Sequence, residues 1–294
     1  MSERSDSPGP QRIDLHSHTS WSDGTTSVGE LYAQARTAGL DVLALTDHDT
    51  VAGWPELPAA VAANGVAAVP GIEVSAEHGH RSVHILALLV DPSPRSELAA
   101  AMAEARDARV DRARRMVELI AKDHPLRWED VEAQVAGETT VIGRPHIADA
   151  LVAAGVSADR SAAFDELLRA SGPYYVPYDA PSPFETVRAI RAAGGVSVLA
   201  HPGSVTRDDE LPLALLEEMI AAGLDGLEVE HREHGPNEIA GLREIAQRHD
   251  LIVTGGSDFH GTGKPNLLGE NLTAPEMLAR IEERATSGTR VLRP

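Results

Sequence analysis

The feature of this sequence that most constrains its fold is the repeated placement of histidines and acids after short apolar runs. His16 and His18 end the first run as His-x-His, and alternate residues of an extended chain point the same way, so the two imidazoles should converge. Later runs carry or lead into further groups of this kind: Asp47-His48-Asp49, Glu73, His84, His201-Pro202 and Asp258-Phe259-His260. Because barrel enzymes carry their catalytic groups at the C-terminal ends of strands, we expect these residues to gather at one end of a barrel.

The apolar runs alternate with helical stretches and predict an α/β fold. The expected strands are Arg12–His16, Val42–Thr46, Val66–Val74, Val83–Val90, Val196–Ala200, Gly226–Glu230 and Leu251–Thr254. Segments with helical spacing lie between several of them, at Val28–Ala38, Phe184–Ala193, Leu211–Ala222 and Asn237–His249. The alternation favours a parallel sheet that closes, or nearly closes, into a barrel. An open doubly wound sheet is the alternative, although no Gly-rich phosphate loop opens the first helix.

The middle of the chain interrupts this alternation. It predicts helices without comparable strands, at Ser96–Lys122, Trp128–Val135, Arg144–Ala154 and Ser161–Ala170. We therefore interpret residues 91–181 as a helical insertion domain between two barrel segments, 12–90 and 182–294. Residues 1–11 are polar and rich in Pro, Gly and Ser, and we expect them to form a disordered tail.

Composition excludes several classes of function. The 294-residue chain has no cysteine, which rules out a thiolate nucleophile, Cys-ligated zinc and an iron–sulfur cluster. The net charge of −19 disfavours long duplex nucleic acid, whereas a small phosphorylated ligand can still enter a locally positive pocket. No apolar run approaches the ~20 residues that span a bilayer, and the N-terminus lacks a signal-peptide pattern, so we expect a cytoplasmic protein without a membrane partner. The oligomeric state is not fixed by the sequence.

The histidines and carboxylates together predict a metal site, because burying so many of them without compensation would be costly. The candidate ligands are His16, His18, Asp23, His48, Glu73, His84, His201, Asp258 and His260. Imidazoles combined with carboxylates suit manganese, iron or zinc better than magnesium alone, and the set could hold about two to three divalent ions. The remaining positive charge of such a centre would attract phosphate.

The order and spacing of these motifs resemble the PHP (polymerase and histidinol phosphatase) family. The matching segments are His16-Ser-His18, Asp23-Gly, Thr46-Asp-His-Asp49, Gly71-Ile-Glu73, His84, Ala200-His-Pro202 and Ser257-Asp-Phe-His260. The segment Gly143-Arg-Pro-His-Ile-Ala148, within a helical insertion, resembles the branch that contains nucleoside 3′,5′-bisphosphate phosphatases and 5′–3′ exonucleases acting on short RNA.

The resemblance implies a distorted (β/α)7 barrel with a trinuclear metal site. It also implies that metal-activated water hydrolyses a phosphomonoester of a small nucleotide, either a nucleoside 3′,5′-bisphosphate or a short oligonucleotide end. By position, His16, His18, Glu73 and Asp258 would hold the first ion, a bridging Glu73 with His84 and His201 the second, and Asp23, His48 and His260 the third. Some family members have histidine at the position of Asp23, so the third site is where metal preference should vary.

Four further residues are assigned supporting roles. Asp47 and Asp49 are expected to take part in catalysis by orienting ligand histidines. Arg144 and His146 open a helix of the insertion, where a guanidinium and helix amides would bind a substrate phosphate.

Other aromatic and imidazole side chains leave more than one interpretation open. His231 follows the strand that ends at Glu230 and is expected to line the substrate pocket. The tyrosine cluster would either stack a base or pack the insertion against the barrel; its members are Tyr174, Tyr175 and Tyr178. The remaining histidines are expected to be exposed: His78, His80, His124, His234 and His249.

Competing hypotheses use parts of the same pattern. Asp47-His-Asp49-Thr-Val51 also fits the motif of haloacid-dehalogenase-type phosphatases, in which Asp47 would be a covalent nucleophile. Amidohydrolases share the initial His-x-His, but neither Lys122 nor Lys264 ends an expected strand to serve as their carboxylated lysine. A histidinol-phosphate-type or other small-molecule phosphatase is a further alternative. A non-catalytic metal-stabilised module is disfavoured because the ligand set looks complete.

Overall fold

A computed structural model describes residues 11–294 apart from residues 80, 136–140, 170–171, 178–179 and 205–210. The expected disordered tail therefore lies almost entirely outside the described residues. Within them, no helix combines the length and apolar character that crossing a membrane requires.

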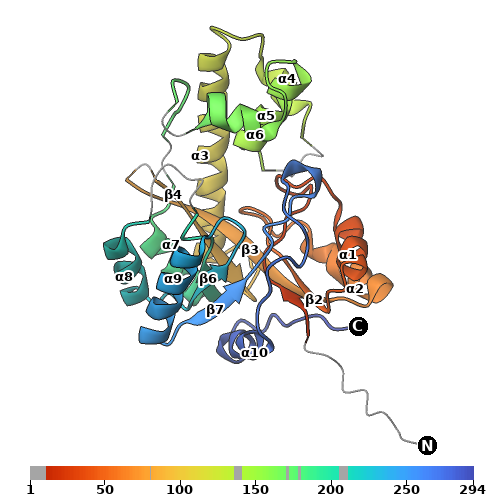
Figure 1. The fold of residues 1–294 in the computed structure, drawn as a ribbon, viewed down its shortest axis with the longest axis vertical. Coiled ribbons are helices and arrows are strands. Elements are labelled where there is room, and N and C mark those ends of the chain that lie inside the picture. The colour runs from red at the N-terminus through yellow and green to blue at the C-terminus, as the bar shows by residue number, and fades with distance from the viewer. Residues whose placement is uncertain (1–10, 80, 136–140, 170–171, 178–179, 205–210) are drawn as a thin grey trace, which may run out of the picture.

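Seven strands form one sheet in which spatial order follows chain order. They are β1 (Ile13–Asp14), β2 (Val42–Leu45), β3 (Ala67–His78), β4 (Arg81–Leu88), β5 (Val196–Leu199), β6 (Gly226–Glu230) and β7 (Ile252–Gly255). The sheet curls until its last strand returns to its first: the Leu15 amide donates to the Gly255 carbonyl at 3.3 Å, and a parallel bridge joins Ser17 to Phe259. The fold is thus a distorted, nearly closed seven-stranded α/β barrel, as the sequence predicts, and not an open sheet (Figure 1).

One strand departs from the expected parallel arrangement. β4 runs antiparallel to both β3 and β5, whereas the other neighbouring pairs are parallel. The reason is local: β3 ends at His78 and β4 begins at Arg81, so no helix can carry the chain back for a parallel return. Because β4 folds directly onto β3, His84 pairs with Ser75, two residues beyond Glu73.

Helices surround the barrel. Those associated with it are α1 (Val28–Thr37), α2 (Leu57–Asn64), α7 (Pro183–Ala192), α8 (Leu213–Ala221), α9 (Pro236–Arg248) and α10 (Pro275–Arg284), with short η1 (Trp54–Glu56) and η3 (Gly261–Gly263). Four of the six match helices expected from the sequence. α2 was not expected, because its Ala/Val-rich sequence has no polar face to reveal a helical period, and α10 was also missed.

The helical middle of the chain projects from one end of the barrel (Figure 1). It contains α3 (Glu97–Ile120), α4 (Trp128–Glu132), α5 (Arg144–Ala153), α6 (Arg160–Ala163) and η2 (Phe164–Leu168). α3 belongs to both parts: Leu98 and Met102 pack in a barrel core cluster, whereas Met116 and Ile120 belong to a separate cluster of the insertion. The exact bounds of the insertion, 91–181, stay a prediction.

Candidate metal centre

Glu73 lies at the centre of the predicted ligands, and both of its oxygens face histidines. Its Oε1 lies 2.8 Å from His84 Nδ1 and 3.0 Å from His201 Nε2. Its Oε2 lies 3.3 Å from His16 Nε2 and 3.1 Å from His18 Nε2. Asp258 Oδ1 completes this cluster at 3.5 Å from His16 Nε2 and 3.4 Å from His18 Nε2. We name these six residues, His16, His18, Glu73, His84, His201 and Asp258, the Glu73 group.

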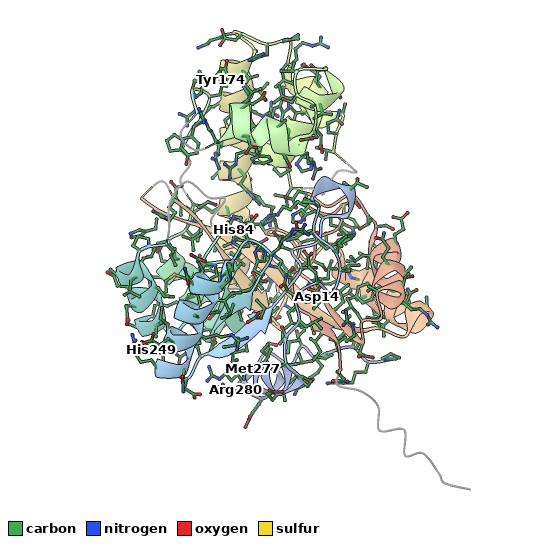
Figure 2. The ribbon with its side chains drawn as sticks, in the orientation of Figure 1. Asp14, His84, Tyr174, His249, Met277 and Arg280 are labelled. Carbon is green, nitrogen blue, oxygen red and sulfur yellow. The ribbon has the colours of Figure 1, made fainter. Side chains whose placement is uncertain are left out.

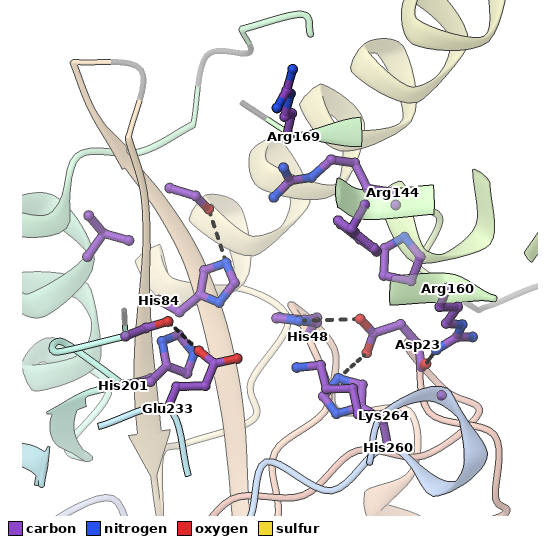
Figure 3. Close-up of a pocket in the computed structure, with 18 of the residues that line it drawn as sticks. Asp23, His48, His84, Arg144, Arg160, Arg169, His201, Glu233, His260 and Lys264 are labelled. Carbon is purple, nitrogen blue, oxygen red and sulfur yellow. Dashed lines mark hydrogen bonds and ion pairs between the residues drawn. The ribbon is translucent and has the colours of Figure 1, made fainter. Parts of the chain in front are cut away.

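The three remaining predicted ligands form an adjacent cluster. Asp23 Oδ1 lies 3.2 Å from His260 Nε2, and Asp23 Oδ2 lies 3.7 Å from His48 Nε2, as the dashed lines of Figure 3 show. We name Asp23, His48 and His260 the Asp23 group. His18 connects the two groups, because its Nε2 faces Glu73 while its Nδ1 lies 3.7 Å from Asp23 Oδ1.

The barrel explains why residues so distant in sequence meet. His16 and His18 follow β1, His48 follows β2 and Glu73 lies within β3, with a parallel bridge between His48 and Glu73. The chain turns sharply after other strands, so that Asp49, His201 and Asp258 have positive φ angles of 50°, 34° and 51°. Non-glycine residues seldom adopt this conformation, and such positions often accompany functional sites.

The donor set fits divalent metal ions. Three combinations place one ligand atom per residue within 4.8 Å of the others: His16, His18, Glu73 and Asp258; His18, Asp23, His48 and His260; and His48, Glu73 and His84. His48 Nδ1 and His260 Nε2 are buried and make no hydrogen bond to a described residue, although Glu73 Oε2 and Asp23 Oδ1 lie 3.3 Å and 3.2 Å away. Buried ring nitrogens that face buried carboxylates without a hydrogen bond are the arrangement that a bound cation would complete.

The charges inside the centre are strongly coupled. Burial alone would raise the pKa of Glu73, but the neighbouring histidines, His48 first, hold it well below its usual value. Burial alone would lower the pKa of His18, but hydrogen bonds to Asp258 and Glu73 outweigh it and raise that pKa to about 9. In the Asp23 group, burial lowers the pKa values of His48 and His260. The pKa of His18 and the pKa values of His48 and His260 are therefore shifted in opposite directions.

Glu228 is a buried carboxylate at the centre that the sequence reading missed. Its Oε1 lies 3.0 Å from His16 Nδ1, and its Oε2 accepts the His201 backbone amide at 2.8 Å. A Cβ atom on Gly256 would lie 2.6 Å from Glu228 Oε1 and 2.4 Å from His16 Cβ, so glycine is required for this approach. A carboxylate on the far nitrogen of a ligand histidine fixes the ring and its tautomer, as in many metal sites.

Asp47 and Asp49 accept hydrogen bonds from backbone amides and hydroxyl groups close to the ligands. Asp47 accepts from the Thr19 amide, the Thr19 hydroxyl and the Ser22 hydroxyl at 2.6–2.7 Å, which fixes the loop before Asp23. Asp49 accepts from the Ser75 amide at 2.7 Å and the Ser75 hydroxyl at 2.8 Å. These bonds order the backbone around the ligands; direct orientation of a histidine ring by either residue stays a prediction.

The centre opens into a pocket of about 1420 Å³ between the barrel and the insertion (Figure 3). Among the residues that the structure describes, three acidic residues line it: Asp23, Asp165 and Glu233. Eight basic residues of the same described part of the chain line it: Arg81, Arg109, Arg112, Arg144, Arg160, Arg169, Arg232 and Lys264. In a chain with a net charge of −19, this excess of positive charge in one pocket favours an anionic ligand.

The predicted substrate-binding residues divide between the pocket wall and its surroundings. Arg144 lines the pocket, with its guanidinium 5.6 Å from the centre of the Phe164 ring. His146 is buried behind it, and its Nδ1 accepts the Gly143 amide at 3.2 Å at the start of α5. His231 is also buried, with Nε2 3.7 Å from Asp258 Oδ2 and its ring 5.4 Å from that of His201. Substrate contact by His146 or His231 stays a prediction.

The two described tyrosines of the predicted cluster lie in different places, one in the core of the insertion and one on the pocket wall. Tyr174 packs against the insertion core and donates its hydroxyl to Asp123 at 2.9 Å; it lies high in the insertion in Figure 2, away from His84 at the barrel. Tyr175 instead lines the pocket, with the Arg112 guanidinium 5.0 Å from its ring centre. Tyr178 lies outside the described residues.

Two basic residues reach the centre without a sequence signal. Lys264 follows η3 and donates to Asp258 Oδ2 at 2.7 Å, although it ends no strand. Arg109, on α3, donates to Asp49 Oδ2 at 3.1 Å.

The predicted exposure of the remaining histidines was only partly right. His78 is exposed, whereas His234 is buried, with Nδ1 2.8 Å from the Val229 carbonyl. His124 and His249 are partly buried, and His80 lies outside the described residues.

Known proteins share this architecture. The chain is 35% identical to a 3′,5′-nucleoside bisphosphate phosphatase of Chromobacterium violaceum, over 86% of this chain and 88% of that protein. It is 32% identical to the 5′-3′ exoribonuclease Rnm of Salmonella typhimurium, over 84% of each chain. A Bifidobacterium adolescentis protein assigned as a metal-dependent phosphoesterase superposes with a TM-score of 0.90 at 48% identity, covering 94% of this chain and 98% of that one.

The names of these relatives and the seven-stranded barrel favour the PHP resemblance over the haloacid-dehalogenase-type alternative. The model of the PHP domain matches residues 14–174, more than half of the chain, from the last residue of β1 through β4 and most of the insertion. With the barrel, the buried ligand set and these relatives in agreement, the chain belongs to the PHP domain family.

Proposed function

We propose that this protein is a metal-dependent phosphoesterase that hydrolyses a phosphomonoester of a small nucleotide, either a nucleoside 3′,5′-bisphosphate or the end of a short oligonucleotide. The observation that carries the proposal is the opening of the Glu73 and Asp23 groups into a pocket that eight basic residues line. The relatives named as a bisphosphate phosphatase and an exoribonuclease support the same class of substrate.

The ligand set fits about two to three divalent ions, of manganese, iron or zinc, because imidazoles predominate over carboxylates. When bound, such ions would supply Lewis-acid activation of water and stabilisation of charge on the phosphoryl oxygens. Glu73 would contact two ions through its separate oxygens, since His16 and His18 face one oxygen while His84 and His201 face the other. Glu228 would hold His16 and the backbone of His201 in place.

Arginines of the insertion would bind a second phosphate group of the substrate. The metal ligands account for the phosphate that is cleaved, whereas Arg144 at the start of α5 and Arg112 on α3 line the part of the pocket that the insertion contributes. A guanidinium binds phosphate through two parallel hydrogen bonds, and the amides at a helix start favour anions. A substrate with two separated phosphates would therefore use both regions.

A phosphate-release screen tests the substrate class. The protein, loaded in turn with manganese, iron or zinc, is incubated with nucleoside 3′,5′-bisphosphates, short 5′-phosphorylated oligonucleotides, nucleoside monophosphates, histidinol phosphate and an aryl phosphate. We expect the highest kcat/KM for substrates with two separated phosphates. A preference for histidinol phosphate, or absence of turnover on every ester, would contradict the proposal.

Trapping of a phosphoenzyme tests the route of hydrolysis. In single-turnover reactions with a 32P-labelled substrate that are stopped with acid, direct attack by water leaves no label on the protein. Labelled phosphate on the side chain of Asp47 would instead indicate a phosphoaspartate intermediate. The three hydrogen bonds that occupy the Asp47 carboxylate favour the first outcome.

A further inference from the structure

Arginines of the insertion and of α3 bond to the backbone segments that carry the Asp23 group. Arg160, at the start of α6, donates from Nη1 to the backbone carbonyl of Asp23 at 3.1 Å. Its Nε and Nη2 donate to the two oxygens of Asp149 on α5, each at 2.5 Å. Asp149 thereby fixes the plane of the guanidinium, and the remaining edge of that guanidinium fixes the loop of Asp23.

The same guanidinium lies against the segment that carries His260. A Cβ atom on Gly263, in η3 three residues beyond His260, would lie 2.1 Å from Arg160 Nη1. A side chain at this position would displace the guanidinium from its present place. Arg160 therefore sits between the loop of Asp23 and the turn that follows His260, and it touches both.

Arginines of α3 bond to Asp49, the residue that follows His48, the third member of the group. Arg106 Nη1 donates to the backbone carbonyl of Asp49 at 2.6 Å, and Arg109 Nη1 donates to Asp49 Oδ2 at 3.1 Å. Asp49 directly follows His48 and has a left-handed backbone, with φ of 50°. The two arginines thus stabilise an unfavourable backbone conformation next to the imidazole.

The Glu73 group has supports of a different origin. Glu228 of β6 holds His16 and His201, and the Ser82 hydroxyl of β4 lies 3.1 Å from His84 Nε2. These two supports belong to the barrel strands, and Lys264, which donates to Asp258 Oδ2, follows η3 and also lies outside the insertion.

We infer that the insertion is a structural part of the third metal site, in which Arg160, Arg106 and Arg109 set the affinity of the Asp23 group for its ion. The inference rests on the proposed function in one respect, namely that the Asp23 group binds an ion. It assigns these arginines a positioning role in addition to the positive charge that some of them contribute to the pocket. The ion in the Asp23 group should therefore depend on the insertion, whereas ions in the Glu73 group should not.

Equilibrium dialysis of the metal-free protein against buffered manganese, followed by elemental analysis, measures the number and affinity of bound ions without any assay of hydrolysis. For Arg160→Ala we expect one ion to bind about 10- to 100-fold more weakly, as for loss of a residue that orients ligands, while the other ions keep their affinities. Gly263→Ala should have the same effect, because the added methyl group displaces the guanidinium without removing it. Arg114→Ala is the matched control: it removes an arginine of α3 that pairs with Glu132 at 3.7 Å, and it should bind like the parent.

A double-mutant comparison assigns the weakened ion to its site. Asp23→Ala should remove the third ion, and adding Arg160→Ala to it should cause no further loss. Equal affinities in Arg160→Ala and the parent, or weakening of every ion alike, would overturn the inference while leaving the proposed function intact. A parent protein that binds no ion at the Asp23 group would overturn the inference together with the third site. Thermal melting of each variant separates these outcomes from unfolding.

Discussion

The Glu73 group and the Asp23 group share one pocket, yet different kinds of structure hold them. Most residues of the Glu73 group lie on or directly after strands, and Glu228 of a neighbouring strand fixes two of its members. In the Asp23 group, Asp23 lies in a loop, and arginines from the insertion hold it and the residue after His48. Strands position side chains more rigidly than loops do. On the proposals above, we expect that the barrel alone holds the Glu73 group in place and that the insertion supports the Asp23 group from outside the barrel.

The largest expected effect is the loss of the Glu73 carboxylate, which we propose to contact two ions. Glu73→Ala removes both oxygens that face His16, His18, His84 and His201, so the variant should lose most of its bound metal and its activity. Elemental analysis of protein purified without chelator measures the loss. Asp225→Asn is the control, because Asp225 precedes β6 and bonds to Ser197 away from the centre. If Glu73→Ala kept its full complement of metal, Glu73 would not be central to either group.

Glu228→Gln should have the next largest effect. The amide keeps the shape of the side chain but removes the charge beside His16, so metal affinity should fall about 10- to 100-fold. The loss should fall on ions of the Glu73 group and leave the ion of the Asp23 group in place, which is the reverse of Arg160→Ala. Competition with a metal-binding dye, with Asp225→Asn again as control, measures it. Unchanged affinity would show that Glu228 serves only the packing of the barrel.

Arg144→Ala should change recognition without changing the metal content. Loss of a charged contact to phosphate should lower kcat/KM for a nucleoside 3′,5′-bisphosphate about ten- to a hundredfold, mainly through KM. An aryl phosphate, which has no second anion, should be hydrolysed almost as well by the variant as by the parent. Equal losses on both substrates would mean that Arg144 supports the metal centre or the fold and does not read a second phosphate.

The smallest effect concerns protons. The surroundings of His18 raise its pKa to about 9, so near neutral pH this imidazole carries a proton that a metal ion must displace. The affinity of the Glu73 group for metal ions should therefore rise as the pH rises towards that value. His48 and His260 have lowered pKa values and should release none. Calorimetry in buffers of different ionisation enthalpy counts the protons. The Asp23→Ala variant should release as many protons on metal binding as the parent protein does. A marked decrease in the number of protons released would place the titrating histidine in the Asp23 group.

The sequence predicted the seven strands and the gathering of nine chemically active side chains, because strand periodicity and strand ends are local signals. It did not predict the antiparallel β4, since an apolar strand reads the same in either direction. Glu228 escaped notice because a single acid inside a short strand carries no motif. Arg109, Arg160 and Lys264 escaped because their partners lie on other elements. The ring of His146 is buried at a helix start, and the substrate contact that its motif suggests stays a prediction.

The most direct test of the central claim measures phosphate release from a nucleoside 3′,5′-bisphosphate by one preparation of the protein in three states. The states are the protein as purified, the protein after its metal has been removed by chelation, and the chelated protein after reloading with manganese. We predict that chelation abolishes hydrolysis and that reloading restores it in proportion to the ions bound. A chelated preparation that elemental analysis shows to be metal-free and that still hydrolyses the substrate at the full rate would contradict the account.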